Sequence, residues 1–109
     1  MRSNERPDVF FSVQTPLGFS VRTTRDYWAL IQRKHPEVAD KAEEIQSCLG
    51  RPARVRRSAQ DPAVYLFYTP LPPYHLAVMI RRLNGDGFVI TSCLTSSIKE
   101  GVEIWPTSG

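Results

Sequence analysis

The sequence lacks any long apolar segment and any apolar leader. No run of about 18 or more apolar residues occurs in the chain, so no membrane-spanning helix is predicted and no membrane partner is expected. The N-terminal segment Met-Arg-Ser-Asn-Glu-Arg-Pro-Asp is too polar for a signal peptide. We therefore expect a cytoplasmic protein.

Cysteine is scarce, which argues against a disulfide framework. The only cysteines are Cys48 and Cys93, and both lie in apolar patterns. Two buried free thiols in a reducing compartment are therefore predicted. A nucleophilic pair of one cysteine and one histidine stays open at this level, although both cysteines fall where the pattern faces the core.

Histidine and glycine are too sparse for a recognisable metal site or phosphate loop. His35 and His75 are the only histidines, and neither lies in an HxxxH, a CxxC or an acidic cluster with the spacing of metal ligands. Gly85 and Gly87 fall in a predicted hairpin turn, with no following helix to direct N–H groups at a phosphate. We expect no metal and no cofactor.

What is present is the composition of one globular domain. The chain has 109 residues, of which 41% are hydrophobic and 23% are charged. Residues 1–8 show no apolar periodicity and are predicted to form a disordered arm, and residues 9–109 are predicted to form the single domain. The oligomeric state stays open.

Helical periodicity predicts two helices that meet at a histidine. Trp28, Ile31 and His35 share one face of the first helix, which should end at His35 because a residue before proline avoids α geometry. Pro36 suits the first turn of the second helix. The apolar face of that second helix consists of Val38, Ala42, Ile45 and Leu49.

Strand periodicity appears on both sides of these helices. A β-hairpin is predicted from residues 9–15 and 19–23, which flank the turn segment Pro-Leu-Gly. Four later segments that show a period of two are residues 54–57, 64–69, 75–82 and 88–95. The tail stays open between a short edge strand and surface packing of Trp105. The predicted fold class is α+β, with two N-terminal helices packed on a four-stranded antiparallel sheet and preceded by the β-hairpin.

Arginines are concentrated between Glu44 and Asp61, where no acidic residue occurs. They are Arg51, Arg54, Arg56 and Arg57. Together with the net charge of +3 and a pI near 9.1, they favour a polyanionic partner. Two interpretations stay open, a solvated edge strand whose arginines discourage pairing and a strip that contacts phosphates.

His35 is the first candidate for chemistry, since it is a titratable residue at a corner beside Arg33 and Lys34. An unperturbed imidazole titrates near pH ~6.5 and can carry a proton in metal-free cleavage of a phosphodiester. The arginines could stabilise the developing charge. Candidate hydroxyl donors are Tyr65, Tyr68, Thr91, Ser92 and Thr95. The alternative is that His35 only ends a helix and bonds a carbonyl.

The order of several sequence blocks resembles a known family. The blocks are Pro-Leu-Gly-Phe-Ser-Val-Arg-Thr-Thr, a helix with Trp28, Arg-Lys-His-Pro-Glu, Gly-Arg-Pro, a tyrosine-containing strand, Leu-Ala-Val-Met-Ile and Gly-Phe-Val-Ile-Thr-Ser. Over about residues 15–101 they resemble the phage-associated barnase–EndoU–colicin–RelE-like (BECR-fold) nuclease superfamily. The resemblance implies a metal-independent endoribonuclease, a toxin or phage-borne effector, with RNA as substrate and a cognate antitoxin or inhibitor protein as partner.

Site residues are carried over from this resemblance by position. The helix histidine corresponds to His35 and the hydroxyl residue of the final strand to Thr91, with Arg57 and Tyr68 as the basic and aromatic residues of the first sheet strands. Residues expected to bind RNA are Arg33, Lys34, Arg54, Arg56 and Arg81.

The chain also departs from the pattern expected of this family. Ser92 and Cys93 stand where a small residue and then an aromatic one are expected, and Thr69 stands where a basic residue would be favourable. A catalytically inactive RNA- or protein-binding module on the same fold is therefore the alternative hypothesis.

Overall fold

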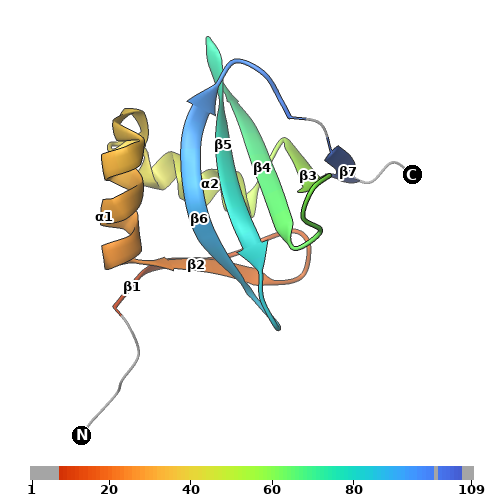
Figure 1. Ribbon diagram of the computed structural model, residues 1–109, viewed down its shortest axis with the longest axis horizontal. Helices are drawn as coiled ribbons and strands as arrows, with labels where there is room; N and C mark the ends of the chain where they lie inside the picture. Colours follow the sequence, from red (N-terminus) through yellow and green to blue (C-terminus); the bar gives the residue numbers. More distant parts are fainter. Residues whose placement is uncertain (1–7, 100, 107–109) are drawn as a thin grey trace, which may run out of the picture.

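The strands in the described part of the chain form one mixed sheet of seven (Figure 1). The computed structural model describes residues 8–99 and 101–106, so residues 1–7 of the predicted arm lie outside it. The strands are β1 (Val9–Gln14), β2 (Ser20–Thr24), β3 (Arg54–Ser58), β4 (Val64–Leu71), β5 (Tyr74–Arg82), β6 (Gly87–Thr95) and β7 (Gly101–Trp105). Their order is β1-β2-β6-β5-β4-β3-β7, and all neighbours are antiparallel except β2 and β6.

The predicted four-stranded antiparallel sheet is wrong because segments at both ends of the domain extend it. The hairpin β1–β2 joins the sheet, since Val21 and Arg22 pair in parallel with Gly87 and Phe88. At the opposite edge, β7 pairs with β3. The arginine-rich strand β3 is thus an interior strand, which excludes the edge-strand interpretation. Such pairings join distant segments, and local periodicity does not specify them.

The first helix ends where the sequence predicts. α1 (Arg25–Lys34) begins where the Thr24 hydroxyl accepts a hydrogen bond from the Tyr27 N–H at 3.1 Å, a typical N-cap. It ends at His35, whose N–H donates to the Ile31 carbonyl at 2.8 Å. The proline at position 36 stops the helix as expected.

The second helix begins later than the apolar pattern predicts. Pro36 starts a 3₁₀ turn, η1 (Pro36–Val38), in which the Ala39 N–H donates to the Pro36 carbonyl. The Lys41 N–H then donates to the Val38 carbonyl, and α2 covers Ala42–Gly50. Val38 nevertheless keeps its predicted core position.

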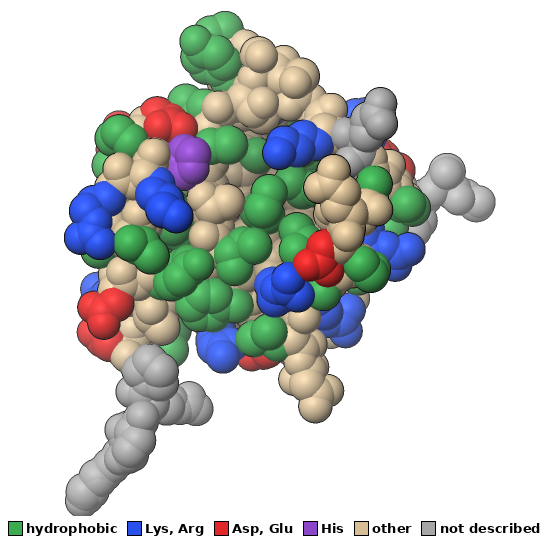
Figure 2. Space-filling model, viewed as in Figure 1, with side chains coloured by type: hydrophobic (Ala, Val, Ile, Leu, Met, Phe, Trp, Pro, Cys, Tyr) green, Lys and Arg blue, Asp and Glu red, His purple; other side chains and the backbone are tan. Residues whose placement is uncertain are grey.

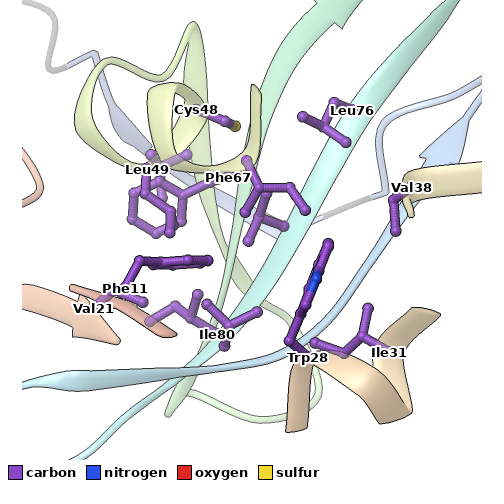
Figure 3. Close-up of a cluster of buried hydrophobic side chains, with 14 of the residues drawn as sticks. Phe11, Val21, Trp28, Ile31, Val38, Cys48, Leu49, Phe67, Leu76 and Ile80 are labelled. Carbon is purple, nitrogen blue, oxygen red and sulfur yellow. The ribbon is translucent and has the colours of Figure 1, made fainter. Parts of the chain in front are cut away.

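The main core lies between the helices and one face of the sheet (Figure 3). α1 contributes Trp28 and Ile31, and α2 contributes Ile45 and Leu49. The strands contribute Phe11, Val21, Val55, Phe67, Leu76, Val78, Ile80 and Val89. Burying one large apolar side chain stabilises a fold by roughly 1.5–3 kcal/mol, so this cluster holds the helices on this face.

The two free cysteines lie in different places. Cys48 is buried in the main core as predicted, and burial raises the pKa of its thiol to about 12. Cys93 is only half-buried and lies on the opposite face of the sheet. The prediction of two buried thiols is therefore wrong for Cys93.

The face of the sheet away from the helices, called the open face below, carries a smaller apolar cluster. Its members are Leu66, Tyr68 and Ala77, with Met79, Cys93 and Ile98 packed against them. Residues 96–99, called the crossing segment below, lead over this face from β6 toward β7 (Figure 1). Figure 2 shows apolar side chains over the central strands, with Lys and Arg side chains around them. None of the helices within the described ranges is long and apolar enough to cross a membrane.

Candidate functional site

Strand alternation and register place polar and apolar side chains in rows across the open face. Residues directly opposite each other on neighbouring strands share a face of the sheet. The three rows are Arg56–Leu66–Met79–Thr91, Arg54–Tyr68–Ala77–Cys93 and Pro70–His75–Thr95. Thr91 and Tyr68, which the sequence singles out, therefore lie on the same face in adjacent rows.

Three hollows lie on this face, and each has at least one residue of the crossing segment in its lining. The central hollow, about 70 Å³, is lined by Leu66, Tyr68, Ala77, Met79, Thr91, Cys93, Thr95, Ser97 and Lys99. The Gln60 hollow, about 480 Å³, is lined by Ser58, Ala59, Gln60, Val64, Leu66, Met79 and Lys99. The His75 hollow, about 240 Å³, is lined by Ala53, Arg54, Tyr68, Thr69, Pro70, His75 and Ile98. Shared lining residues make the three hollows neighbours.

Tyr68 forms the floor under the crossing segment. It is 2% exposed, and its hydroxyl accepts a hydrogen bond from the Lys99 backbone N–H at 3.1 Å. The Arg56 guanidinium donates to the Lys99 carbonyl at 3.2 Å. These two bonds hold Lys99 where it lines both the central and the Gln60 hollow.

His35 lies at the junction of α1 and η1, with its side chain 34% exposed. Its Nδ1 atom is 3.3 Å from the Glu37 carboxylate oxygen Oε2. An Nδ1–H donated to this carboxylate would orient the ring and leave Nε2 for proton exchange. The side chain thus has a carboxylate partner, whereas the alternative interpretation expected a carbonyl.

Glu37, the partner of His35, lies on η1, close enough to β6 for its charge to act on Cys93. η1 packs beside β6, and Figure 1 shows α1 along the same strand. Burial raises the pKa of the Cys93 thiol most, the negative charge of Glu37 raises it further, and the positive charge of Lys99 lowers it. Since Cys93 lines the central hollow, Glu37 and Lys99 are both charges of this site.

Arg57 is not brought together with the other carried-over residues. It pairs with Tyr65, which packs edge-on against Phe19 at 6.1 Å and contacts the main core. Arg57 therefore lies on the helix side of the sheet, whereas Tyr68 and Thr91 lie on the open face. Arg56 and Arg57 are adjacent in the sequence, but neighbouring residues of a strand point to opposite faces of the sheet. Only Arg56 therefore lies on the open face.

Three of the predicted RNA-binding arginines lie on the open face and are paired with carboxylates. Arg54 and Arg56 both contact Glu103, with Nε–O distances of 3.4 and 3.0 Å. Arg81 contacts Asp61 at 2.6 Å. Partly exposed pairs of this kind contribute little stability, so the arginines can turn toward a phosphate. Arg33 and Lys34 are exposed at the end of α1 beside His35.

The pKa of the Asp61 carboxyl is lowered at the rim of this face. The hydrogen bond from the Ala63 backbone N–H is the main cause, and the Arg81 guanidinium adds to it. Asp61 therefore stays ionised beside Arg81 over the neutral pH range, and another anion would have to compete with it for the guanidinium.

Sequence reasoning missed Lys99, Gln60 and His75 as site residues. Lys99 follows β6 in a segment without periodicity, and only the register of β7 brings it back over the sheet. His75 lies near the start of β5, after a proline-rich turn, and its spacing in the sequence tests it only as a metal ligand. Within residues 8–99 and 101–106, no three His, Cys, Asp or Glu residues cluster in a way that could hold a metal ion.

Comparisons with family models, curated proteins and solved structures found no match to this chain. The resemblance to BECR-fold nucleases therefore rests on the sequence blocks alone.

Proposed function

We propose that this protein is a metal-independent endoribonuclease that cleaves RNA bound on the open face by acid–base catalysis. The observation that carries the proposal is the convergence of three groups. Thr91 and Lys99 line the central hollow, and Glu37, to which His35 is paired, acts electrostatically on Cys93 of the same hollow. A proton carrier, a hydroxyl donor and a cation are what such a cleavage needs.

His35 is the proposed proton carrier. Cleavage of RNA begins when a base takes the proton from the 2′-hydroxyl, and it ends when an acid protonates the leaving 5′-oxygen. Glu37 would orient the ring through Nδ1. Nε2 would then exchange the proton with the substrate.

Lys99 and Thr91 are the proposed stabilisers of the charge that develops on the phosphate. Both line the central hollow, where Thr91 is half-buried and can donate its hydroxyl while the exposed Lys99 supplies positive charge. The cations Arg33, Lys34, Arg54, Arg56 and Arg81 would contact neighbouring phosphates, so binding would weaken as salt rises.

The biological setting proposed here follows the family resemblance. A metal-independent ribonuclease of this kind acts as a toxin or phage-borne effector in the cytoplasm, and a cognate antitoxin or inhibitor protein would restrain it. High-yield expression of the unmodified protein without a partner would count against this setting.

The second candidate function is a catalytically inactive RNA-binding module. Two observations favour it: the Tyr68 hydroxyl is engaged by Lys99, and Arg57 faces the helix side of the sheet. A chain that kept the open face but lost catalysis would retain the arginines and their salt-dependent binding.

An RNA cleavage assay in excess EDTA tests the proposal. The wild-type protein should cleave, and His35→Ala should lower the rate by about 10²- to 10⁴-fold, the usual contribution of one general acid or base. Gln32→Ala, one turn earlier on α1, is the matched control and should cleave normally. Full activity of a clean His35→Ala preparation would overturn the catalytic assignment, and binding without cleavage by the wild type would favour the inactive module.

A further inference from the structure

The His75 hollow is a second built feature of the open face that the acid–base site does not use. It lies where β3, β4 and β5 meet Ile98 of the crossing segment, and its volume is about 240 Å³. It shares Tyr68 with the central hollow. Because the crossing segment covers Tyr68, the two hollows lie on either side of that segment, and a chain bound across it would reach both.

We propose that the His75 hollow binds one nucleobase, that of a nucleotide next to the bond cleaved at the central hollow. This inference rests on the proposed function and adds a subsite that can select among RNA sequences. Base recognition in single-stranded RNA depends on unstacked bases that enter such pockets.

The size of the hollow suits one ring system. Pockets that enclose drug-sized molecules have volumes of about 300–1,000 Å³. At about 240 Å³ the His75 hollow is smaller, so it fits a planar base better than a folded peptide segment or an acyl chain.

The lining residues have the chemistry that bases require. Pro70 and Ile98 provide apolar walls, while the planar groups of Arg54 and His75 can stack on a base or donate hydrogen bonds to its edge. His75 is half-buried, which limits the water that would compete for such bonds.

The charge of Arg54 is available to a ligand. Its Nε atom is 3.4 Å from Glu103, and its side chain is 41% exposed. Glu103 has a shorter contact of 3.0 Å with Arg56, so Glu103 stays paired if Arg54 turns toward a nucleotide. An anionic nucleotide is thus favoured over a neutral ring of the same size.

The test measures nucleotide binding separately from cleavage. Backbone NMR spectra are recorded while each of the four ribonucleoside 5′-monophosphates, and inorganic phosphate as a separate probe, is added to the wild-type protein. At least one nucleotide should cause saturable shifts at Thr69, His75 and Ile98, whereas inorganic phosphate should not. Absence of shifts with all four nucleotides, or the same shifts with phosphate alone, would overturn the proposal.

A variant that fills the hollow gives the second arm. Ala53→Trp places a large side chain at the hollow and keeps the Ala53 N–H bond to the Tyr68 carbonyl at 2.9 Å. It should weaken nucleotide binding at least tenfold, and the matched control Ala29→Trp, at an exposed position of α1, should bind within twofold of wild type. His75→Ala, a smaller change, should reduce the preference among the four nucleotides. Unchanged affinity and preference in both hollow variants would overturn the proposal.

Mapping of the cleavage sites on a mixed-sequence RNA separates this inference from the proposed function. A wild-type protein that binds nucleotides in the hollow but does not cleave in EDTA would retain the base site and refute the nuclease. A protein that cleaves at the same sites in the wild type and Ala53→Trp, with no nucleotide shifts, would retain the nuclease and refute the base site.

Discussion

The Lys99 backbone N–H donates a hydrogen bond to the Tyr68 hydroxyl at 3.1 Å, and this bond ties the crossing segment to the middle of the open face. Packing sets the position of Tyr68, which is almost fully buried. The Lys99 carbonyl also accepts a hydrogen bond from Arg56. Tyr68 is therefore a positioning residue for Lys99, the cation of the central hollow.

Tyr68→Phe should loosen the crossing segment while the sheet stays folded. The change removes the acceptor of the Lys99 N–H, and a single hydrogen bond contributes about 0.5–1.5 kcal/mol to stability. Urea unfolding should show a loss in that range, and the Lys99 amide should exchange with solvent much faster. Tyr65→Phe, on the other face, is the control and should leave the Lys99 amide protected. Equal exchange in wild type and Tyr68→Phe would contradict the role of this bond.

The charges around Cys93 can be tested without any assumption about function. Glu37 raises the pKa of the Cys93 thiol and Lys99 lowers it, although burial is the largest cause of the shift. Glu37→Gln should therefore lower this pKa, and Lys99→Met should raise it. The thiolate is the species that reacts, so alkylation by iodoacetamide at about pH 8 should be faster in Glu37→Gln and slower in Lys99→Met. Glu44→Gln on α2 is the control, and identical rates in all four proteins would exclude Glu37 from the site.

Cys48 should make the fold less stable at high pH. Its pKa is raised from 9.0 to about 12 in the folded protein, so the stabilising effect of the protonated thiol is complete below pH 9 and is lost as pH rises toward 12. For one proton, the free energy of unfolding should fall by about 1.4 kcal/mol per pH unit above pH 9. About 2 kcal/mol of this free energy should therefore be lost by about pH 10.5. Urea unfolding of Cys93→Ser at several pH values should show this loss. The double variant Cys48→Ala/Cys93→Ser should show a smaller pH slope; an unchanged slope would contradict the assignment to Cys48.

Local features of the sequence predicted the elements of this fold better than their pairing. Pro36 ends α1 as expected and Thr24 caps its start, since proline geometry and capping act within a few residues. The start of α2 was misplaced because Val38 fits the apolar pattern of a helix even though a 3₁₀ turn presents it to the core. The parallel pairing of Arg22 with Phe88 joins distant segments and leaves no local signal.

The sequence names single candidate residues, but which of them share a face of the sheet depends on strand pairing. Thr91 and Tyr68 share the open face, whereas Arg57, the neighbour of Arg56 on the same strand, points to the helix side. Lys99 enters the site only because β7 pairs beyond β3 and draws the chain across the sheet. The long-range order of strands therefore decides which polar residues meet.

Gly101 should tolerate no side chain, because β7 approaches β3 closely at this position. An added Cβ would lie 2.5 Å from the Arg57 carbonyl oxygen, so the backbone would have to shift. Gly101→Ala should therefore destabilise the fold by about 1–3 kcal/mol, the usual range for overpacking. Gly50→Ala at the end of α2 is the matched control, since its Cβ would meet Val13 at an ordinary 3.4 Å. Thermal unfolding measures both; equal melting temperatures for the two variants would refute the close approach.

The two faces of the sheet should differ in their effect on RNA binding. Arg81 lies on the open face, whereas Arg57 lies on the helix side. If RNA binds the open face, Arg81→Gln should weaken binding and reduce the slope of log K against log salt by about one, the effect of losing one phosphate contact. Arg57→Gln removes the same charge from the other face and should leave the slope unchanged. Fluorescence titrations of a labelled single-stranded RNA at several salt concentrations measure both variants. A reduced slope in Arg57→Gln alone would move the RNA to the helix side and reject the open face as its binding surface.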